Sequence, residues 1–236
     1  MKNRSTQYLY GLLELAHLAL CVSYGFYLIP LVFAHKYWII DSTIVLVLLI
    51  GLIYDNFIIA ASRNLTNLLS NTSMQKLHFP RYILHSLVLP LCLINLAHYG
   101  ERFTGSAWFA PPLVVLCLVV LILDVKHLKD CNKLTYTSIK IIVDNNTGMA
   151  KAQLFDPASE RKDLLYSIAP AIIVTLSSIL IGFIIMIQTG GRHWALFAGG
   201  LVMLLLAGSP SKNHHVKSLL SNIGELFFML GYIYTL

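Results

Sequence analysis

Charged residues are scarce in this sequence, since only 12% of its 236 residues are Asp, Glu, Lys or Arg. Soluble domains carry about 25% charged residues. Hydrophobic residues make up 57% of the chain, and its mean hydropathy is +0.71. The composition therefore predicts an integral membrane protein with little room for a separate soluble domain.

Cysteine is also sparse, and recognisable metal, redox and nucleotide motifs are missing. Cys21, Cys92, Cys117 and Cys131 stand singly with no Cys-x-x-Cys spacing, so neither a zinc ribbon nor a redox pair is indicated. His-Glu-x-x-His, P-loop and Gly-x-Gly-x-x-Gly patterns do not occur either. We expect neither a metal nor a cofactor.

Long apolar runs are what the sequence does contain, and they predict an all-α bundle of about seven transmembrane helices. The run 193–208 is the weakest, because its length of about 24 Å falls short of the ~30 Å hydrocarbon core. We expect one transmembrane domain over 1–236. The predicted spans are 8–34, 38–61, 81–99, 107–125, 164–188, 193–208 and 218–236.

Basic residues give this predicted bundle an orientation. Only Lys36, Arg102 and Arg192 fall on one side of it, and every other Lys and Arg falls on the opposite side. The positive-inside rule then predicts a cytosolic N-terminus and a C-terminus outside. The net charge of +6 predicts contacts with membrane lipids, namely anionic headgroups on the cytosolic side, and does not indicate nucleic-acid binding.

The connection 127–163 is predicted to be a cytosolic loop that carries a β-hairpin. Its β-prone segments 137–143 and 149–155 flank the turn-forming cluster 144–148. Two strands alone are marginally stable, so the hairpin should pack on the bundle, on a second copy or on a partner. The sequence is thus compatible with a homo-oligomer.

Five ionisable residues inside the predicted spans are the candidate catalytic groups: Glu14, His17, Asp55, His85 and Glu225. A charge in hydrocarbon costs about 2.5–3.5 kcal/mol on insertion scales, so such a residue is kept when it is partnered, hydrated or functional. The predicted orientation places the first four in the cytosolic half of the bilayer and Glu225 near the middle. We therefore predict a cavity open toward the cytosolic leaflet.

Each of these groups also has a structural interpretation. Asp55 could form a salt bridge with Arg63 or Arg81, or could be a carboxyl that exchanges protons. Glu14 and His17 share a helix face and could be an acid–base couple or a plain hydrogen bond. Asp124, beside Lys126, is interpreted as an interfacial charge.

A polar stripe on 81–99 adds candidate binding residues. Steps of three and four residues place His85, Cys92, Asn95 and Tyr99 on one face. That face lines a cavity or forms interhelical hydrogen bonds. The predicted substrate-binding residues are Tyr54, Asn56, Asn95, Tyr99 and Tyr232.

These features favour a membrane enzyme that acts on a hydrophobic isoprenoid or lipid substrate. Its chemistry would be metal-independent acid–base catalysis by carboxyl and imidazole groups, as in an intramembrane lyase, isomerase or cyclase. A proton-coupled small-solute transporter or an ion channel is the alternative, with Asp55, His85 and Glu225 as the relay. A membrane scaffold that recruits partners through its cytosolic hairpin is a third hypothesis.

Overall fold

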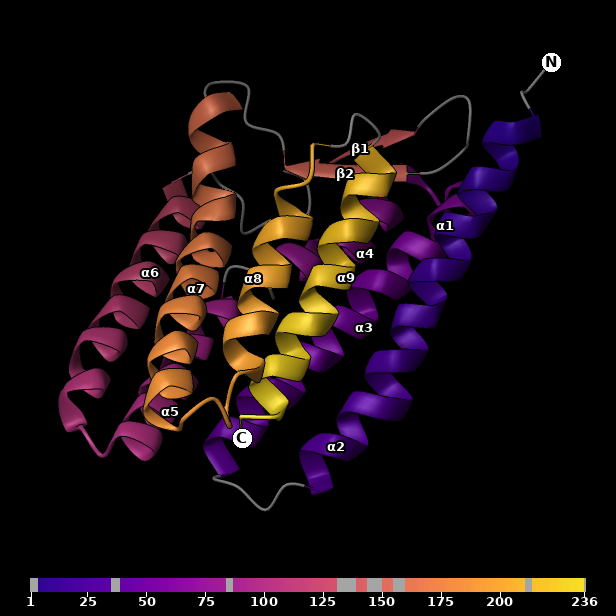
Figure 1. Cartoon of the computed structure of the whole chain (residues 1–236). Coiled ribbons are helices and arrows are strands. Elements are labelled where there is room, and N and C mark those ends of the chain that lie inside the picture. Colours follow the sequence, from indigo (N-terminus) through magenta and orange to yellow (C-terminus); the bar gives the residue numbers. More distant parts are fainter. Residues whose placement is uncertain are drawn as a thin grey trace.

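A computed structural model describes residues 4–34, 39–83, 87–130, 139–143, 150–154, 160–210 and 214–235. Its longer elements are α1 (Arg4–Val22), α3 (Ile39–Leu68), α6 (Ala110–Asp130), α7 (Glu160–Gln188) and α9 (His214–Ile233). The shorter ones are α2 (Ile29–Ala34), α4 (Asn71–Ile83), α5 (Cys92–Thr104), α8 (Ala195–Ala207), β1 (Ile139–Val143) and β2 (Ala150–Leu154). The helices form a bundle in which α1 begins at the end where the strands lie and α9 ends at the opposite end (Figure 1).

The prediction of seven spanning helices is wrong. Within the described ranges, 4 segments are both long and apolar enough to cross a membrane. These segments are Leu12–Ala34, Ile40–Ala61, Ala107–Lys126 and Ala169–Gln188. They suit a multi-pass membrane protein, but the seven-helix bundle has to be replaced by four such spans and shorter or more polar helices among them.

Helix length and composition explain the difference. The predicted span 81–99 is interrupted, because α4 ends at Ile83 and α5 begins only at Cys92, after a 3₁₀ turn that contains the buried Pro90. α5 and α8 have 13 residues each, which gives about 20 Å per helix and leaves both short of the hydrocarbon core. α9 is longer, but Lys217, Asn222 and Glu225 interrupt its apolar sequence.

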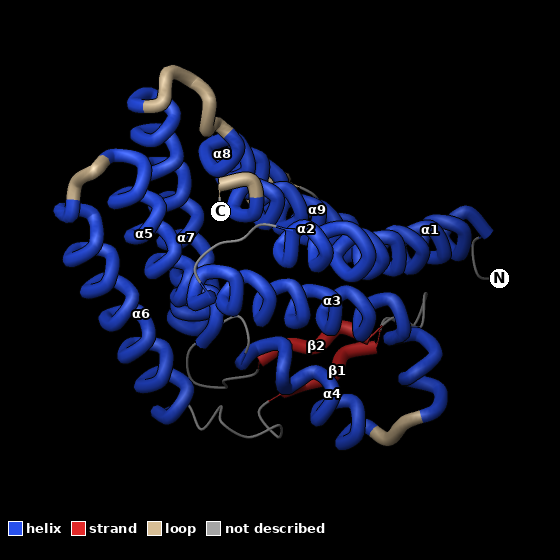
Figure 2. Tube along the Cα trace, turned by 90° about the horizontal axis from the view of Figure 1, so that it is seen from below, coloured by secondary structure: helices blue, strands red, loops and turns tan. Residues whose placement is uncertain are grey.

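The strands β1 and β2 pair in antiparallel register, with Ile139 opposite Leu154 and Val143 opposite Ala150. They lie against α3 and α4 (Figure 2). Residues 144–149, where the sequence predicts the turn, lie outside the described residues. A two-stranded sheet needs such a neighbour, because it is marginal on its own.

α7, α8 and α9 pack closely because glycines remove side chains from their contacts. A Cβ on Gly199 of α8 would lie 2.6 Å from the carbonyl oxygen of Phe227, and a Cβ on Gly231 of α9 would lie 2.8 Å from that of Ala195. A Cβ on Gly182 of α7 would meet the α8 backbone at 2.5 Å. Only glycine fits these positions without a shift of a helix.

The hydrophobic core contains residues of α3, α5, α7 and α9 together with the first helix, which packs on α3 and α9. There the first helix changes to a wider π-helical segment, Ser23–Leu28, whose Tyr24 is fully buried. Outer faces remain apolar as well: on α6, Val115, Leu118 and Ile122 are exposed. Exposed apolar side chains along a 20-residue segment are what a lipid-facing helix requires.

Candidate functional site

An amide network joins α1, α3 and α9 inside the bundle. Asn56 of α3 is fully buried, and its Oδ1 lies 2.8 Å from Nδ1 of His17 and 2.9 Å from Nδ2 of Asn222. The Asn56 Nδ2 group donates to the carbonyl oxygen of Leu52 at 2.8 Å. The hydroxyl of Tyr24 donates to the backbone carbonyl of Asn222 at 3.0 Å.

These contacts fix the hydrogen-bonding roles of the network. Because the Asn56 amide nitrogen is committed to Leu52, its oxygen accepts from both neighbours. His17 therefore donates through Nδ1–H, and its neutral form leaves Nε2 as an acceptor. Asn56 thus holds the two other helices to α3.

A small pocket with an internal volume of about 50 Å³, partly open to the surroundings, adjoins this network. Glu225 lines it one helical turn after Asn222, and Thr175 of α7 is the other polar residue of its wall. The remaining wall residues are apolar: Leu48, Gly51, Leu52, Val88, Leu89, Ala171, Met203, Phe228 and Met229. A pocket wall with so few polar groups suits an apolar part of a ligand.

The other predicted catalytic residues take different positions. Asp55 is buried beside Asn56 on α3, and Glu14 is half-buried one turn before His17 on α1. His85 lies outside the described residues. Tyr54, a predicted binding residue, donates its hydroxyl to the Leu77 carbonyl at 2.6 Å, which fastens α3 to α4.

A second polar cluster lies at the start of α3. Asp41, in the first turn of α3, is buried, and Nδ1 of His98 on α5 lies 2.8 Å from its Oδ1. Nδ2 of Asn95 donates to the Asp41 backbone carbonyl at 3.3 Å. The His98 side chain is 36% exposed, so this pair connects a buried carboxylate with the surface.

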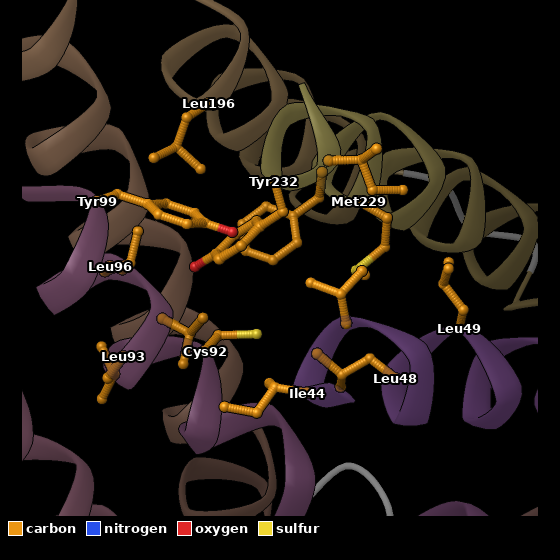
Figure 3. Close-up of a cluster of buried hydrophobic side chains, with 14 of the residues drawn as sticks. Ile44, Leu48, Leu49, Cys92, Leu93, Leu96, Tyr99, Leu196, Met229 and Tyr232 are labelled. Atoms are coloured by element: carbon orange, nitrogen blue, oxygen red, sulfur yellow. The ribbon is translucent and has the colours of Figure 1, made fainter. Parts of the chain in front are cut away.

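Tyr99 and Tyr232 lie between this cluster and the cavity. Their side chains point toward one another (Figure 3), with ring centroids 5.9 Å apart, and both are almost completely buried. The Tyr232 hydroxyl lies 2.8 Å from Oγ of Ser178 on α7. The predicted binding residues Asn95, Tyr99 and Tyr232 are thus grouped in a region apart from the His17–Asn56–Asn222 network.

Asp124, interpreted from the sequence as an interfacial charge, lies two residues before the end of the apolar segment Ala107–Lys126. Its side chain is buried on α6, and Oδ2 has no hydrogen-bond partner in the described part of the chain. No group of three His, Cys, Asp or Glu residues that could hold a metal ion occurs in that part.

Asp41, Thr175 and Ser178 are polar residues of these clusters that the sequence does not single out. Asp41 begins an apolar run, where an acid is usually a helix-terminal residue. Thr175 and Ser178 are three residues apart on the predicted span 164–188, so they share a helix face. That small periodic pair is the signal that could have identified them.

Known proteins provide no assignment for this arrangement, because no protein-family model, curated protein or solved structure matches the chain.

Proposed function

We propose that the protein is a membrane enzyme that binds a hydrophobic molecule in the cavity between α3, α7 and α9 and uses Glu225 for proton transfer. The observation that carries the proposal is a single carboxyl group in the wall of a mainly apolar cavity. Such a wall favours an isoprenoid or acyl chain, and Thr175 and Glu225 would orient its polar end.

In this mainly apolar pocket, the carboxyl group of Glu225 is suited to acid–base chemistry. Apolar walls disfavour the charged form of a carboxylic acid, so a proton can be given and taken back without a permanent charge in the cavity. The Asn222–Asn56–His17 network begins one turn from Glu225 on the same helix. It would fix α9 and hence the position of Glu225 against the substrate.

Binding is tested by filling the cavity. Ala171 lines it and is replaced by phenylalanine in the variant Ala171→Phe. Purified protein is mixed with radiolabelled geranylgeraniol or diacylglycerol, and bound label is counted. We expect one probe to bind to wild type and to Glu225→Gln, and binding to fall at least about tenfold in Ala171→Phe because the phenyl ring occupies the site.

Catalysis is tested by converting the bound probe and following its mass. Glu225→Gln keeps the size of the side chain but removes the acid, so turnover should fall by roughly 100-fold or more while binding persists. Glu101→Gln, an exposed glutamate of α5, is the matched control. Equal binding by wild type and Ala171→Phe would reject the site, and unchanged turnover in Glu225→Gln would reject the role of the carboxyl group.

A further inference from the structure

The buried polar groups follow one another along the inside of the bundle. From the Asp41–His98 pair they continue through Asn95 and Tyr99 of α5 to Tyr232 of α9, which bonds Ser178 of α7. Ser178 is one turn from Thr175, which shares the cavity wall with Glu225. Glu225 is one turn from Asn222, which leads through Asn56 to His17.

Two buried atoms in this series, the Tyr99 hydroxyl and Oδ1 of Asn95, form no hydrogen bond of good geometry to any described residue. The Asn95 side chain lies close to the Tyr99 hydroxyl, and Cys92 lies close to the hydroxyl of Tyr232. Buried polar atoms with such unused hydrogen-bonding capacity are a usual binding site of an internal water molecule, which needs two to four polar partners.

We propose that this series of groups conducts protons through the protein, with water bound at Tyr99, Asn95 and Tyr232. A hydroxyl group or a water molecule accepts a proton on one side and releases another on the opposite side, so the path carries protons with no net change in its groups. The amides of Asn95, Asn56 and Asn222 hold the path in place. The half-exposed His98 exchanges protons with the surroundings at one end.

Charged and titratable groups surround the His98 end of the path. Asp41 is supplied by α3, and Arg102 of α5 is exposed near Asp41 and Tyr99. Cys92 is the thiol beside the two tyrosines. Beyond Asp41 and Arg102, the groups named on the path up to Glu225 are hydroxyls, amides and a thiol, which relay protons or hold water.

The path ends on the carboxyl group used in the proposed function, but conduction does not require a cavity ligand. The test is therefore made on ligand-free protein in phospholipid vesicles. A pH gradient is imposed, the membrane potential is clamped with K⁺ and valinomycin, and pyranine inside the vesicles reports the rate of proton entry. We expect the wild type to be clearly faster than protein-free vesicles.

Tyr99→Phe is the decisive variant. It removes a buried hydroxyl that forms no hydrogen bond to a described residue, so it should not lower the melting temperature. It should nevertheless slow proton entry by roughly tenfold or more, because one step of the path is lost. Tyr54→Phe is the matched control: its half-buried hydroxyl donates to the Leu77 carbonyl between α3 and α4, off the path, and its rate should equal that of the wild type.

Tyr232→Phe and His98→Gln should slow proton entry as well, and they test the path on either side of Tyr99. A wild-type rate equal to that of protein-free vesicles overturns the proposal. So does a folded Tyr99→Phe protein that conducts at the wild-type rate. Either result leaves probe binding and turnover at Glu225 unaffected, so the two proposals can fail separately.

Discussion

At the scale of single residues, burial of polar side chains is the property that organises this protein. Asn56, Asn95, His17 and Asp41 are all at least nine-tenths buried, and each takes part in a hydrogen bond between helices. In a bundle that has apolar surroundings on the outside as well, such bonds determine which helix faces meet. Which helix faces pack together therefore depends on where these polar side chains lie along each helix, and not only on whether they are charged.

Replacement of Asn56 should lower the stability of the protein. Asn56→Leu removes the shared acceptor of His17 and Asn222 and leaves two buried donors unsatisfied. The free energy of unfolding should fall by about 1–3 kcal/mol, measured by thermal or denaturant unfolding in detergent. Asn67→Leu, at an exposed position on the same helix, should change it by less than about 0.5 kcal/mol. Equal effects of the two substitutions would contradict the role of Asn56 in holding α1 and α9 to α3.

The His17 tautomer is a second consequence at this scale. Because Asn56 Oδ1 is the acceptor, neutral His17 should carry its proton on Nδ1. Nitrogen NMR of selectively labelled protein distinguishes a protonated Nδ1 from a protonated Nε2 by chemical shift. Asn56→Asp offers an internal check, because a carboxylate at this position should stabilise the doubly protonated imidazolium instead.

At the scale of elements, the lengths of the helices depend both on the apolar runs and on the residues that end a run or change the helix type. The sequence correctly indicates four apolar segments, in 8–34, 38–61, 107–125 and 164–188, each of which contains or nearly matches a segment long enough to span. It overestimates 81–99, because the hydropathy of Leu87–Leu93 hides the change of helix type to a 3₁₀ turn at Leu89–Leu91 before α5. The pairing of helix faces, which creates the cavity, depends on contacts between residues far apart in the chain.

Close packing of α8 on α9 gives a test at this scale. Gly199→Ala should destabilise the protein by about 1–3 kcal/mol, because the added Cβ would lie 2.6 Å from a carbonyl oxygen and backbone cannot easily move. Gly25→Ala is the control, since its Cβ would meet only Ile53 Cδ1 at 3.8 Å. That variant should be neutral or slightly more stable. Melting temperatures of the two proteins compare the effects directly, and the reverse order would refute the close contact.

At the scale of the whole molecule, composition was sufficient to predict a membrane protein, but not the grouping of its polar residues. Depth in the bilayer suggested that His17, Asp55 and Glu225 share a site, and the structure brings His17 to Asn56 and Asn222, with Glu225 one turn further in the cavity wall. Asn95, Tyr99 and Tyr232 form a different group. Helix periodicity in the sequence predicts which residues share a helix face. Which residues of another helix that face contacts is known only from the three-dimensional structure.

The outer surface of α6 tests whether the molecule as a whole sits in lipid as its composition implies. Val115 is 59% exposed near the middle of the apolar segment Ala107–Lys126. Val115→Arg should reduce the carbonate-resistant, membrane-integrated fraction, because an arginine at the centre of a spanning helix costs about 2.5–3.5 kcal/mol on insertion scales. Glu101→Arg, exposed on α5 and outside the four candidate spans, should leave that fraction unchanged. Full integration of Val115→Arg would mean that this face of α6 meets water or another protein surface and not hydrocarbon.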